Sequence, residues 1–188
     1  MPTATPQTRL TSRQKLLNTA AALFYSHGIN ATGIDTVIAQ AGVTKGSMYH
    51  HFPSKEALIA AYLYGEADSW LSSMRALDLQ NSAPADRVAL LFSAVADQVD
   101  AGTFSGCPFT NAAIECPDMP GVQIAITRYR RMLQDHIEVL LAGVGSDPLT
   151  ATVTVIYDGA LTSAKLGATA GRIREIAEFV RTLVSSQP

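Results

Sequence analysis

Apolar residues recur at helical spacing along almost the whole chain, whereas the alternation typical of strands is nearly absent. Capping signals divide this pattern into separate helices. In the first of them, Thr11 and Gln14 form a capping box at the start, and Gly28 supplies the stop. The sequence therefore predicts an all-α protein.

About nine helices are expected. Their approximate spans are 11–27, 33–41, 44–50, 54–79, 88–101, 108–116, 121–141, 149–166 and 172–184. Thr32 is expected to cap the second helix, Thr44 the third, and Pro53 precedes the start of the fourth. At 1.5 Å per residue, some 25 residues span about 37 Å, so this fourth helix, ending near Leu79, is long enough to connect two modules.

Composition excludes several classes of protein. Of 188 residues, 47% are hydrophobic, which is enough for a small module and one medium domain. No apolar run approaches the roughly 20 residues of a membrane span, and "MPTATPQTRL" lacks the apolar core of a signal peptide. We expect a cytoplasmic protein with no membrane partner.

The two cysteines, Cys107 and Cys116, are too few for a disulfide framework, and nothing near them has zinc-ligand spacing. Nine helical steps separate them by about 13 Å, beyond the roughly 7 Å that a disulfide tolerates between Cα atoms. We expect free thiols, no metal site and no cofactor.

Charge is unevenly distributed along the chain. Up to Leu58 there are five basic and two acidic residues, whereas the remainder has nine basic and 14 acidic ones. A basic N-terminal module on an acidic body suits a local contact with phosphate groups.

The stretch "AGVTKGSMYHHFPSKEAL", residues 41–58, lies at the end of this basic module. Two short helices joined at Gly42 predict a helix-turn-helix, whose second helix enters the DNA major groove. Lys45 can pair with a phosphate, and Gly46 allows close backbone approach. Hydroxyl and imidazole groups for further hydrogen bonds come from Thr44, Ser47, Tyr49 and His51. The alternative is a solvated surface turn whose aromatic residues pack on the first helix.

The segment "KLLNTAAALFYSHGINATGIDTVIAQAGVTKGSMYHHFPSKEAL", residues 15–58, resembles the DNA-binding domain of TetR-type transcriptional regulators over its whole length. Positions in register include Gly28, Thr32, Ala41-Gly42-Val43, Lys45-Gly46, Tyr49, His51-Phe52 and Ser54-Lys55-Glu56. One departure is Gly33, where the family commonly has a hydroxyl residue that meets phosphate.

The resemblance implies a homodimer that binds a palindromic double-stranded DNA operator, acts as a repressor, and is released by a small-molecule inducer. It implies a helix-turn-helix domain over 9–53 and a helical ligand-binding and dimerisation domain over 54–188. The DNA-binding candidates are Thr32, Gly33, Thr44, Lys45, Gly46, Ser47, Tyr49, His50, His51 and Lys55.

Small residues near the C-terminus favour close helix packing. Gly159, Ser163 and Gly167 recur every four residues, which suits a four-helix bundle built from two chains. The predicted dimer interface comprises Ile156, Gly159, Ala160, Ser163, Gly167, Ile176, Phe179 and Val180. Packing within one chain is the alternative.

The larger domain also supplies candidates for a ligand cavity, mostly aromatic residues and methionines. They are Trp70, Met74, Phe92, Phe104, Cys107, Phe109, Asn111, Tyr129, Met132, His136 and Tyr157. Each has an alternative role as ordinary core or surface. Because few of them are charged, we expect an apolar or neutral inducer.

Cys107 directly precedes the proline that starts a helix, and a helix N-terminus favours the thiolate form. This suggests a sensor for electrophiles or oxidants, and a buried structural cysteine is the alternative. Two rival functions remain: a cysteine-dependent enzyme with His136 as base, and a helix-turn-helix scaffold acting through protein partners. No strand-turn-helix framework or phosphate loop supports an enzyme, so no catalytic residue is predicted.

Overall fold

The computed structural model of the protein describes residues 10–76, 82–144 and 147–187. Within these ranges it contains nine α-helices and no strand, as the sequence predicts. The helices are α1 (Ser12–His27), α2 (Ile34–Ala41), α3 (Lys45–His51), α4 (Lys55–Arg75), α5 (Pro84–Asp100), α6 (Pro108–Glu115), α7 (Pro120–Leu140), α8 (Asp147–Lys165) and α9 (Ala170–Ser185).

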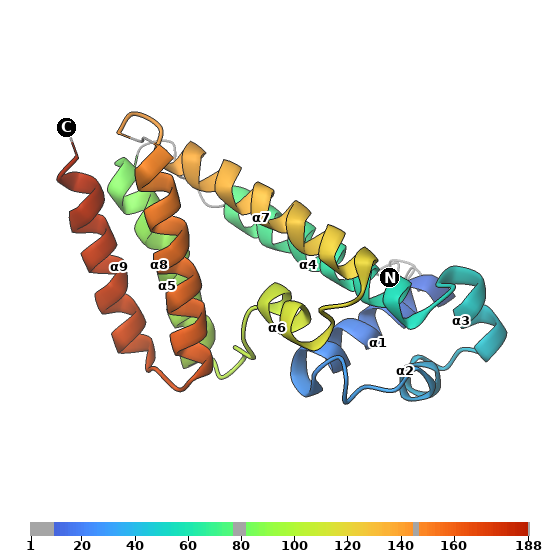
Figure 1. The fold of residues 1–188 in the computed structure, drawn as a ribbon. Coiled ribbons are helices and arrows are strands. Elements are labelled where there is room, and N and C mark those ends of the chain that lie inside the picture. The colour runs from blue at the N-terminus through green and yellow to red at the C-terminus, as the bar shows by residue number, and fades with distance from the viewer. Residues whose placement is uncertain (1–9, 77–81, 145–146, 188) are drawn as a thin grey trace, which may run out of the picture.

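The helices form an elongated molecule (Figure 1). Helices α1–α3 lie at one end, and α5, α8 and α9 lie at the other, where α5 packs along α9. The long helices α4 and α7 run side by side between the two ends. The short helix α6 lies between the α1–α3 group and the α5–α8–α9 group, and it contacts α4 and α7.

Local capping chemistry explains most helix starts. The Thr11–Gln14 capping box is present, and the Thr44 and Ser54 hydroxyls accept hydrogen bonds from Ser47 N and Ala57 N. Helices α5, α6 and α7 each begin with proline, whose missing N–H is not needed in the first turn.

Three predicted helix boundaries are wrong. Helix α5 begins at Pro84 rather than near residue 88. Thr32 does not cap α2, because Gly33 occupies the N-cap position and the Thr32 hydroxyl instead donates to Gly28 O at 2.8 Å. Helix α4 ends at Arg75 rather than near Leu79. Leu79 itself lies outside the described residues, as does residue 9, the expected start of the first domain.

The apolar core is continuous between the N-terminal helices and α4. Leu58 and Ile59 are fully buried, and the ring of Tyr62 on α4 meets that of Phe24 on α1 edge to face, with centroids 5.6 Å apart. The first half of α4 therefore completes the core of the α1–α3 group.

No helix in the described ranges combines the length and hydropathy of a membrane span.

Candidate functional site

The α2–turn–α3 unit is a helix-turn-helix set by a glycine. Gly42 adopts a left-handed conformation (φ 63°, ψ 41°), and its N–H bonds back to the last turn of α2. An L side chain is strained at this φ, so glycine is the residue that allows α3 to start three residues later, at Lys45. Below α3, Met48 is fully buried and Phe52 nearly so, which anchors this short helix to the core.

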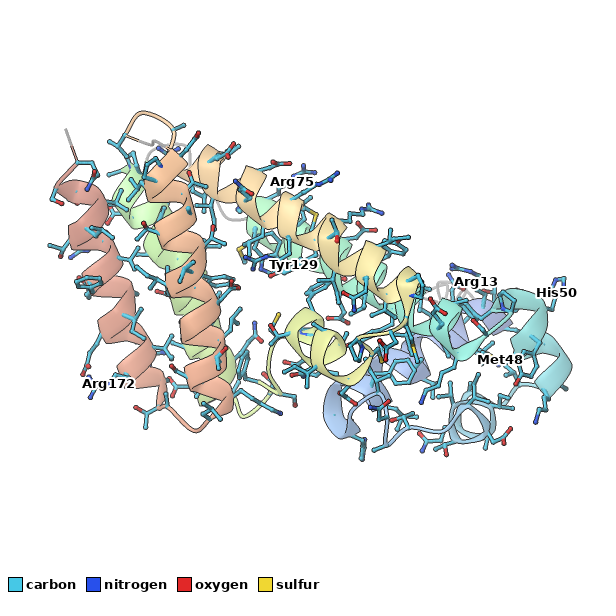
Figure 2. All side chains as sticks on the ribbon, viewed as in Figure 1. Arg13, Met48, His50, Arg75, Tyr129 and Arg172 are labelled. Carbon is cyan, nitrogen blue, oxygen red and sulfur yellow. The ribbon has the colours of Figure 1, made fainter. Side chains whose placement is uncertain are left out.

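The opposite face of α3 is open to solvent. Its exposed residues are Thr44, Lys45, Gly46, Tyr49 and His50, and Ser47 and His51 are half-buried beside them. Tyr49 is 44% exposed, a high value for a large aromatic side chain. Figure 2 shows His50 pointing away from the protein body while Met48 points into it. The polar face of α3 thus presents the donors that the sequence predicts for DNA contact.

Lys45 forms one ion pair on this face. Its Nζ lies 3.3 Å from Asp35 Oδ1 on α2, and both side chains are largely exposed. An exposed pair of this kind contributes about 0–1 kcal/mol, so the ammonium group is available to a stronger anion.

Three predicted DNA-binding residues lie outside α3 and its N-cap. Thr32 is buried with its hydroxyl turned into the domain, so its side chain does not reach the surface. Lys55 is half-buried, and its Nζ donates to Ile29 O at 2.7 Å. Gly33 is exposed at the N-terminus of α2 with no side-chain cap, which leaves N–H groups of the first turn facing solvent.

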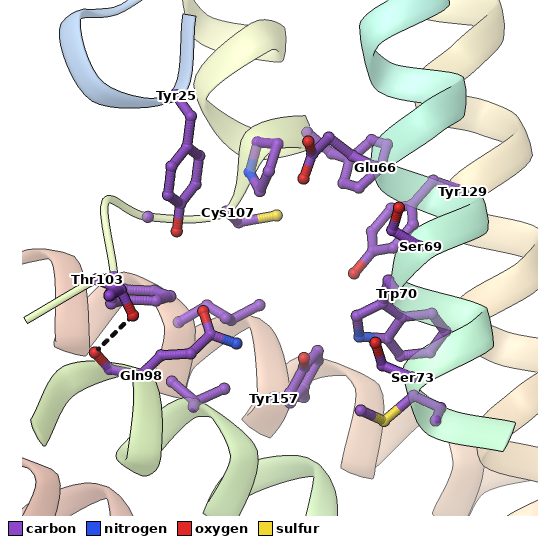
Figure 3. Close-up of a pocket in the computed structure, with 17 residues that line it drawn as sticks. Tyr25, Glu66, Ser69, Trp70, Ser73, Gln98, Thr103, Cys107, Tyr129 and Tyr157 are labelled. Carbon is purple, nitrogen blue, oxygen red and sulfur yellow. Dashed lines mark hydrogen bonds between the residues drawn. The ribbon is translucent and has the colours of Figure 1, made fainter. Parts of the chain in front are cut away.

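A cavity of about 400 Å³ lies between the two ends of the molecule (Figure 3). It is lined by Tyr25, Glu66, Ser69, Trp70, Ser73, Met74, Val95, Gln98, Thr103, Phe104, Gly106, Cys107, Pro108, Phe109, Tyr129, Tyr157 and Leu161. These residues come from α1, α4, α5, α6, α7, α8 and the segment that precedes α6. Seven of the eleven predicted ligand residues are among them.

The other four predicted ligand residues do not line the cavity. Phe92 is fully buried in the core, edge to face with Tyr157 at 5.6 Å between centroids. Asn111 donates to Ser105 O, at 3.4 Å from its Nδ2, and Met132 packs against the core. The His136 ring packs against Trp70, and burial together with the Arg75 charge lowers its pKa.

Two polar groups at the cavity wall lack partners among the described residues. The Trp70 Nε1–H is buried and has no acceptor at hydrogen-bonding geometry. Burial raises the pKa of the Tyr157 hydroxyl, and the nearby Trp70 N–H opposes this rise. The Glu66 carboxyl makes no hydrogen bond or ion pair there, and burial raises its pKa. Sequence reasoning missed Glu66 because an isolated acidic residue on a helix gives no signal that it faces inward.

Cys107 is the N-cap of α6 and lines the cavity, whereas Cys116 lies at the other end of that helix. Both thiols are buried and free, as predicted. Burial raises the pKa of the Cys116 thiol, so this cysteine is held as the unreactive thiol.

Hydrogen bonds tie the helix-turn-helix end to the cavity. On α1, the Tyr25 hydroxyl lines the cavity and accepts a hydrogen bond from Ser105 N at 3.0 Å. At the other end of α6, Glu115 accepts a hydrogen bond from Asn30 N at 2.8 Å, and its carbonyl accepts one from Asn30 Nδ2. Glu56 at the start of α4 accepts from Gly121 N at 2.6 Å. The C-terminal end of α6 is therefore bonded directly to the loop between α1 and α2.

The predicted dimer residues divide into two groups. Ala160 and Val180 are buried within the single chain, whose helices α8 and α9 both pack on α5, so these two side chains are not exposed on its surface. Gly159, Gly167 and Phe179 are exposed, and Ile156, Ser163 and Ile176 are half-buried. Phe179 is 63% exposed and Val155 on α8 is 69% exposed, so both helices present apolar side chains to solvent.

The described residues contain no cluster of three or more His, Cys, Asp or Glu side chains suited to a metal ion.

Comparison with known proteins identifies the class. Residues 16–62 match the profile of the family described as bacterial regulatory proteins, tetR family. The crystal structure of a TetR-family transcriptional regulator from Streptomyces coelicolor is 30% identical, with a TM-score of 0.79 over 93% of this chain and 96% of that one. The HTH-type transcriptional repressor KstR2 of Mycolicibacterium smegmatis is 29% identical over 157 residues, covering 81% of this chain and 76% of its own.

These matches define a helix-turn-helix transcriptional regulator. The chain belongs to the TetR family. The matched proteins are regulators of transcription, which favours this class over the cysteine-dependent enzyme considered above.

Proposed function

We propose that the protein is a repressor that binds a palindromic operator as a homodimer in the cytoplasm and releases it when a small molecule enters the cavity. The observation that carries this proposal is that one chain contains both an exposed polar helix, α3, and a cavity. Hydrogen bonds connect α6 and the segment before it to α1 and the α1–α2 loop, which belong to the same group of helices as α3. The name of the relative from Mycolicibacterium smegmatis supports repression as the sign of regulation.

The proposed DNA-contacting surface is the exposed face of α3 with the start of α2. The DNA backbone is contacted by Lys45, Gly46 and Tyr49. Base edges are contacted by Thr44, Ser47 and His50. His51, at the end of the helix, belongs to the same DNA-contacting surface. Gly33 offers the N–H groups at the start of α2 to a phosphate. Thr32 is left out because it is buried, and Lys55 joins only if its Nζ leaves Ile29 O.

We propose the division of the chain into a DNA-binding unit over 9–53 and a ligand-binding and dimerisation unit over 54–188. Helix α4 serves both, because its first half packs on α1 and its second half carries Glu66, Ser69 and Trp70 to the cavity. A guest that displaces α4 or α6 thereby changes the position of α3, and in a homodimer the spacing of the two recognition helices.

The homodimer is proposed to form through the exposed faces of α8 and α9. Phe179 and Val155 supply apolar area. Gly159 allows a partner to approach closely, because it has no side chain and no neighbouring element lies within 4 Å of the position that its Cβ would take. Ala160 and Val180 contribute from beneath, by packing the helices that carry this surface.

Phe179→Glu is expected to convert the dimer to a monomer, because a two-fold interface would bury two like charges. Sedimentation velocity at a fixed protein concentration measures the change. Ile124→Glu on α7 is a matched control, since Ile124 is also 63% exposed and lies outside α8 and α9. Equal masses for the two variants would exclude this interface.

Cys107 is proposed as a second route of release. Its thiol lines the cavity at the N-terminus of α6, so addition of an electrophile there would place new atoms against the helix that contacts the Asn30 loop. The alternative, a structural cysteine, predicts no response to electrophiles.

The experiment that tests the proposal is footprinting of the purified protein on DNA flanking its own gene, with and without candidate ligands and a thiol-reactive electrophile. We expect a protected palindrome that a ligand releases, and an electrophile response that Cys107→Ser abolishes. Glu115→Gln should still protect the operator but resist release, because it weakens the Asn30 contact. A ligand-insensitive footprint would refute induction, and a Cys107→Ser protein that still responds would refute the thiol sensor.

A further inference from the structure

The cavity contains one acidic side chain and no basic one. Glu66 on α4 is the only Asp, Glu, Lys, Arg or His among the lining residues. Figure 3 shows its carboxyl group inside the upper part of the cavity, near Cys107. The remaining polar side-chain groups of the lining are hydroxyls, one amide, a thiol and the Trp70 indole N–H.

No cation from the described residues neutralises Glu66. Lys165 is near the cavity mouth, but its Nζ donates to Ser105 O at 2.7 Å. Arg130 is held by both carboxylate oxygens of Asp158 at 2.8 Å each. Burial raises the pKa of the Tyr25 and Tyr62 hydroxyls and the nearby Glu66 carboxylate adds to the rise, so both hydroxyls stay neutral. The carboxylate is therefore partly desolvated without compensation, and burial raises its pKa.

Aromatic rings form much of the remaining wall. They are Tyr25, Trp70, Phe104, Phe109, Tyr129 and Tyr157. Phe109 stacks on Tyr129 with centroids 3.6 Å apart, and Trp70 meets the Tyr129 ring edge to face. The faces of such rings carry negative partial charge and attract cations, most strongly where water is excluded.

We propose that the ligand of this cavity is a small apolar organic cation, whose charged group lies beside Glu66 and whose apolar part lies against the aromatic rings. The inference rests on the proposed role of the cavity as the inducer site, and it replaces the neutral inducer expected from sequence. A cation compensates the carboxylate and interacts with the rings, whereas an anion is repelled by both and a neutral guest leaves the carboxylate unpaired.

The test compares phenyltrimethylammonium with tert-butylbenzene, a neutral molecule of the same shape, by calorimetric titration of the full chain. Trp70 is the only tryptophan, so a change in its emission places the bound molecule in this cavity. We expect the cation to bind at least about 10-fold more tightly than the neutral molecule, corresponding to about 1.4 kcal/mol.

Glu66→Gln should weaken binding of the cation about 10-fold and leave binding of tert-butylbenzene unchanged, because glutamine keeps the shape and removes the charge. Glu138→Gln, which removes the same charge from the exposed face of α7, is the matched control and should change neither affinity. Circular dichroism and the unfolding midpoint confirm that the variants fold.

The outcomes separate this inference from the proposed function. Equal affinity for both molecules, with a Trp70 signal, would overturn the cation assignment and leave the cavity as a ligand site. Absence of binding by both would overturn the assignment together with the ligand role. A tightly bound cation that fails to release a footprinted operator would support the assignment and contradict induction through this site.

Discussion

Simultaneous replacement of Lys45 and Tyr49 by alanine is expected to reduce operator affinity about 10⁴-fold. Each residue is proposed to make one hydrogen bond to a charged phosphate, for which about 1.5 kcal/mol is a typical contribution. A homodimer loses four such bonds, or about 6 kcal/mol in total. Neither side chain is buried in the core, so the fold should persist. Fluorescence anisotropy with labelled operator DNA measures the loss.

The control for this double variant is Arg172→Ala, which removes an exposed positive charge from α9 at the opposite end of the molecule. It should leave affinity unchanged. Lys45→Ala alone should weaken binding to all DNA sequences and lower the slope of log affinity against log salt by about one unit for each phosphate that is no longer neutralised. Full affinity in the double variant would favour the helix-turn-helix scaffold that acts through protein partners.

Phe92→Ala is expected to destabilise the protein by about 3–5 kcal/mol, the usual effect of removing a fully buried phenyl ring from a packed core. Phe92 has no exposed surface and packs edge to face on Tyr157, so its removal leaves a cavity beneath the ligand site. Urea unfolding followed by circular dichroism measures the change. All variants are compared at one protein concentration, because the proposed dimerisation would contribute to stability.

Phe104→Ala is the matched comparison, since Phe104 lines the cavity and is only partly buried. It should cost less stability than Phe92→Ala and should weaken binding of an aromatic ligand. If the two variants were equally destabilised, the distinction between a core phenylalanine and a cavity phenylalanine would be wrong.

The helix pattern and the helix-turn-helix were predictable because they depend on neighbours in sequence. The Thr11–Gln14 capping box, the left-handed Gly42 and the proline that opens α6 each act within one or two turns. The start of α5 at Pro84 is an exception, because the sequence pattern predicts a start near residue 88. One error arose where two local contacts compete for one hydroxyl, because Gly28 lies only four residues before Thr32. Thr32 is the example, since its hydroxyl bonds to Gly28 O instead of capping α2.

Which side chains are buried, and which of them line the cavity, was less predictable than where the helices lie in the sequence. Aromatic residues and methionines are typical of both cores and cavities, so sequence did not separate Phe92 from Phe104 or place His136 outside the cavity. For the same reason Ala160 and Val180 were grouped with the exposed Phe179, although they face their own protomer.

The sequence by itself determined an all-α chain with a recognition helix, because capping, periodicity and turn glycines are local properties. Only the tertiary structure decided which side chains share the cavity, since residues as distant as Tyr25, Glu66 and Tyr157 meet there through the packing of separate helices. That packing also places Glu66 in a cavity lined by aromatic rings, where burial raises the pKa of its carboxyl, and the proposed role of Glu66 in ligand selection depends on this placement.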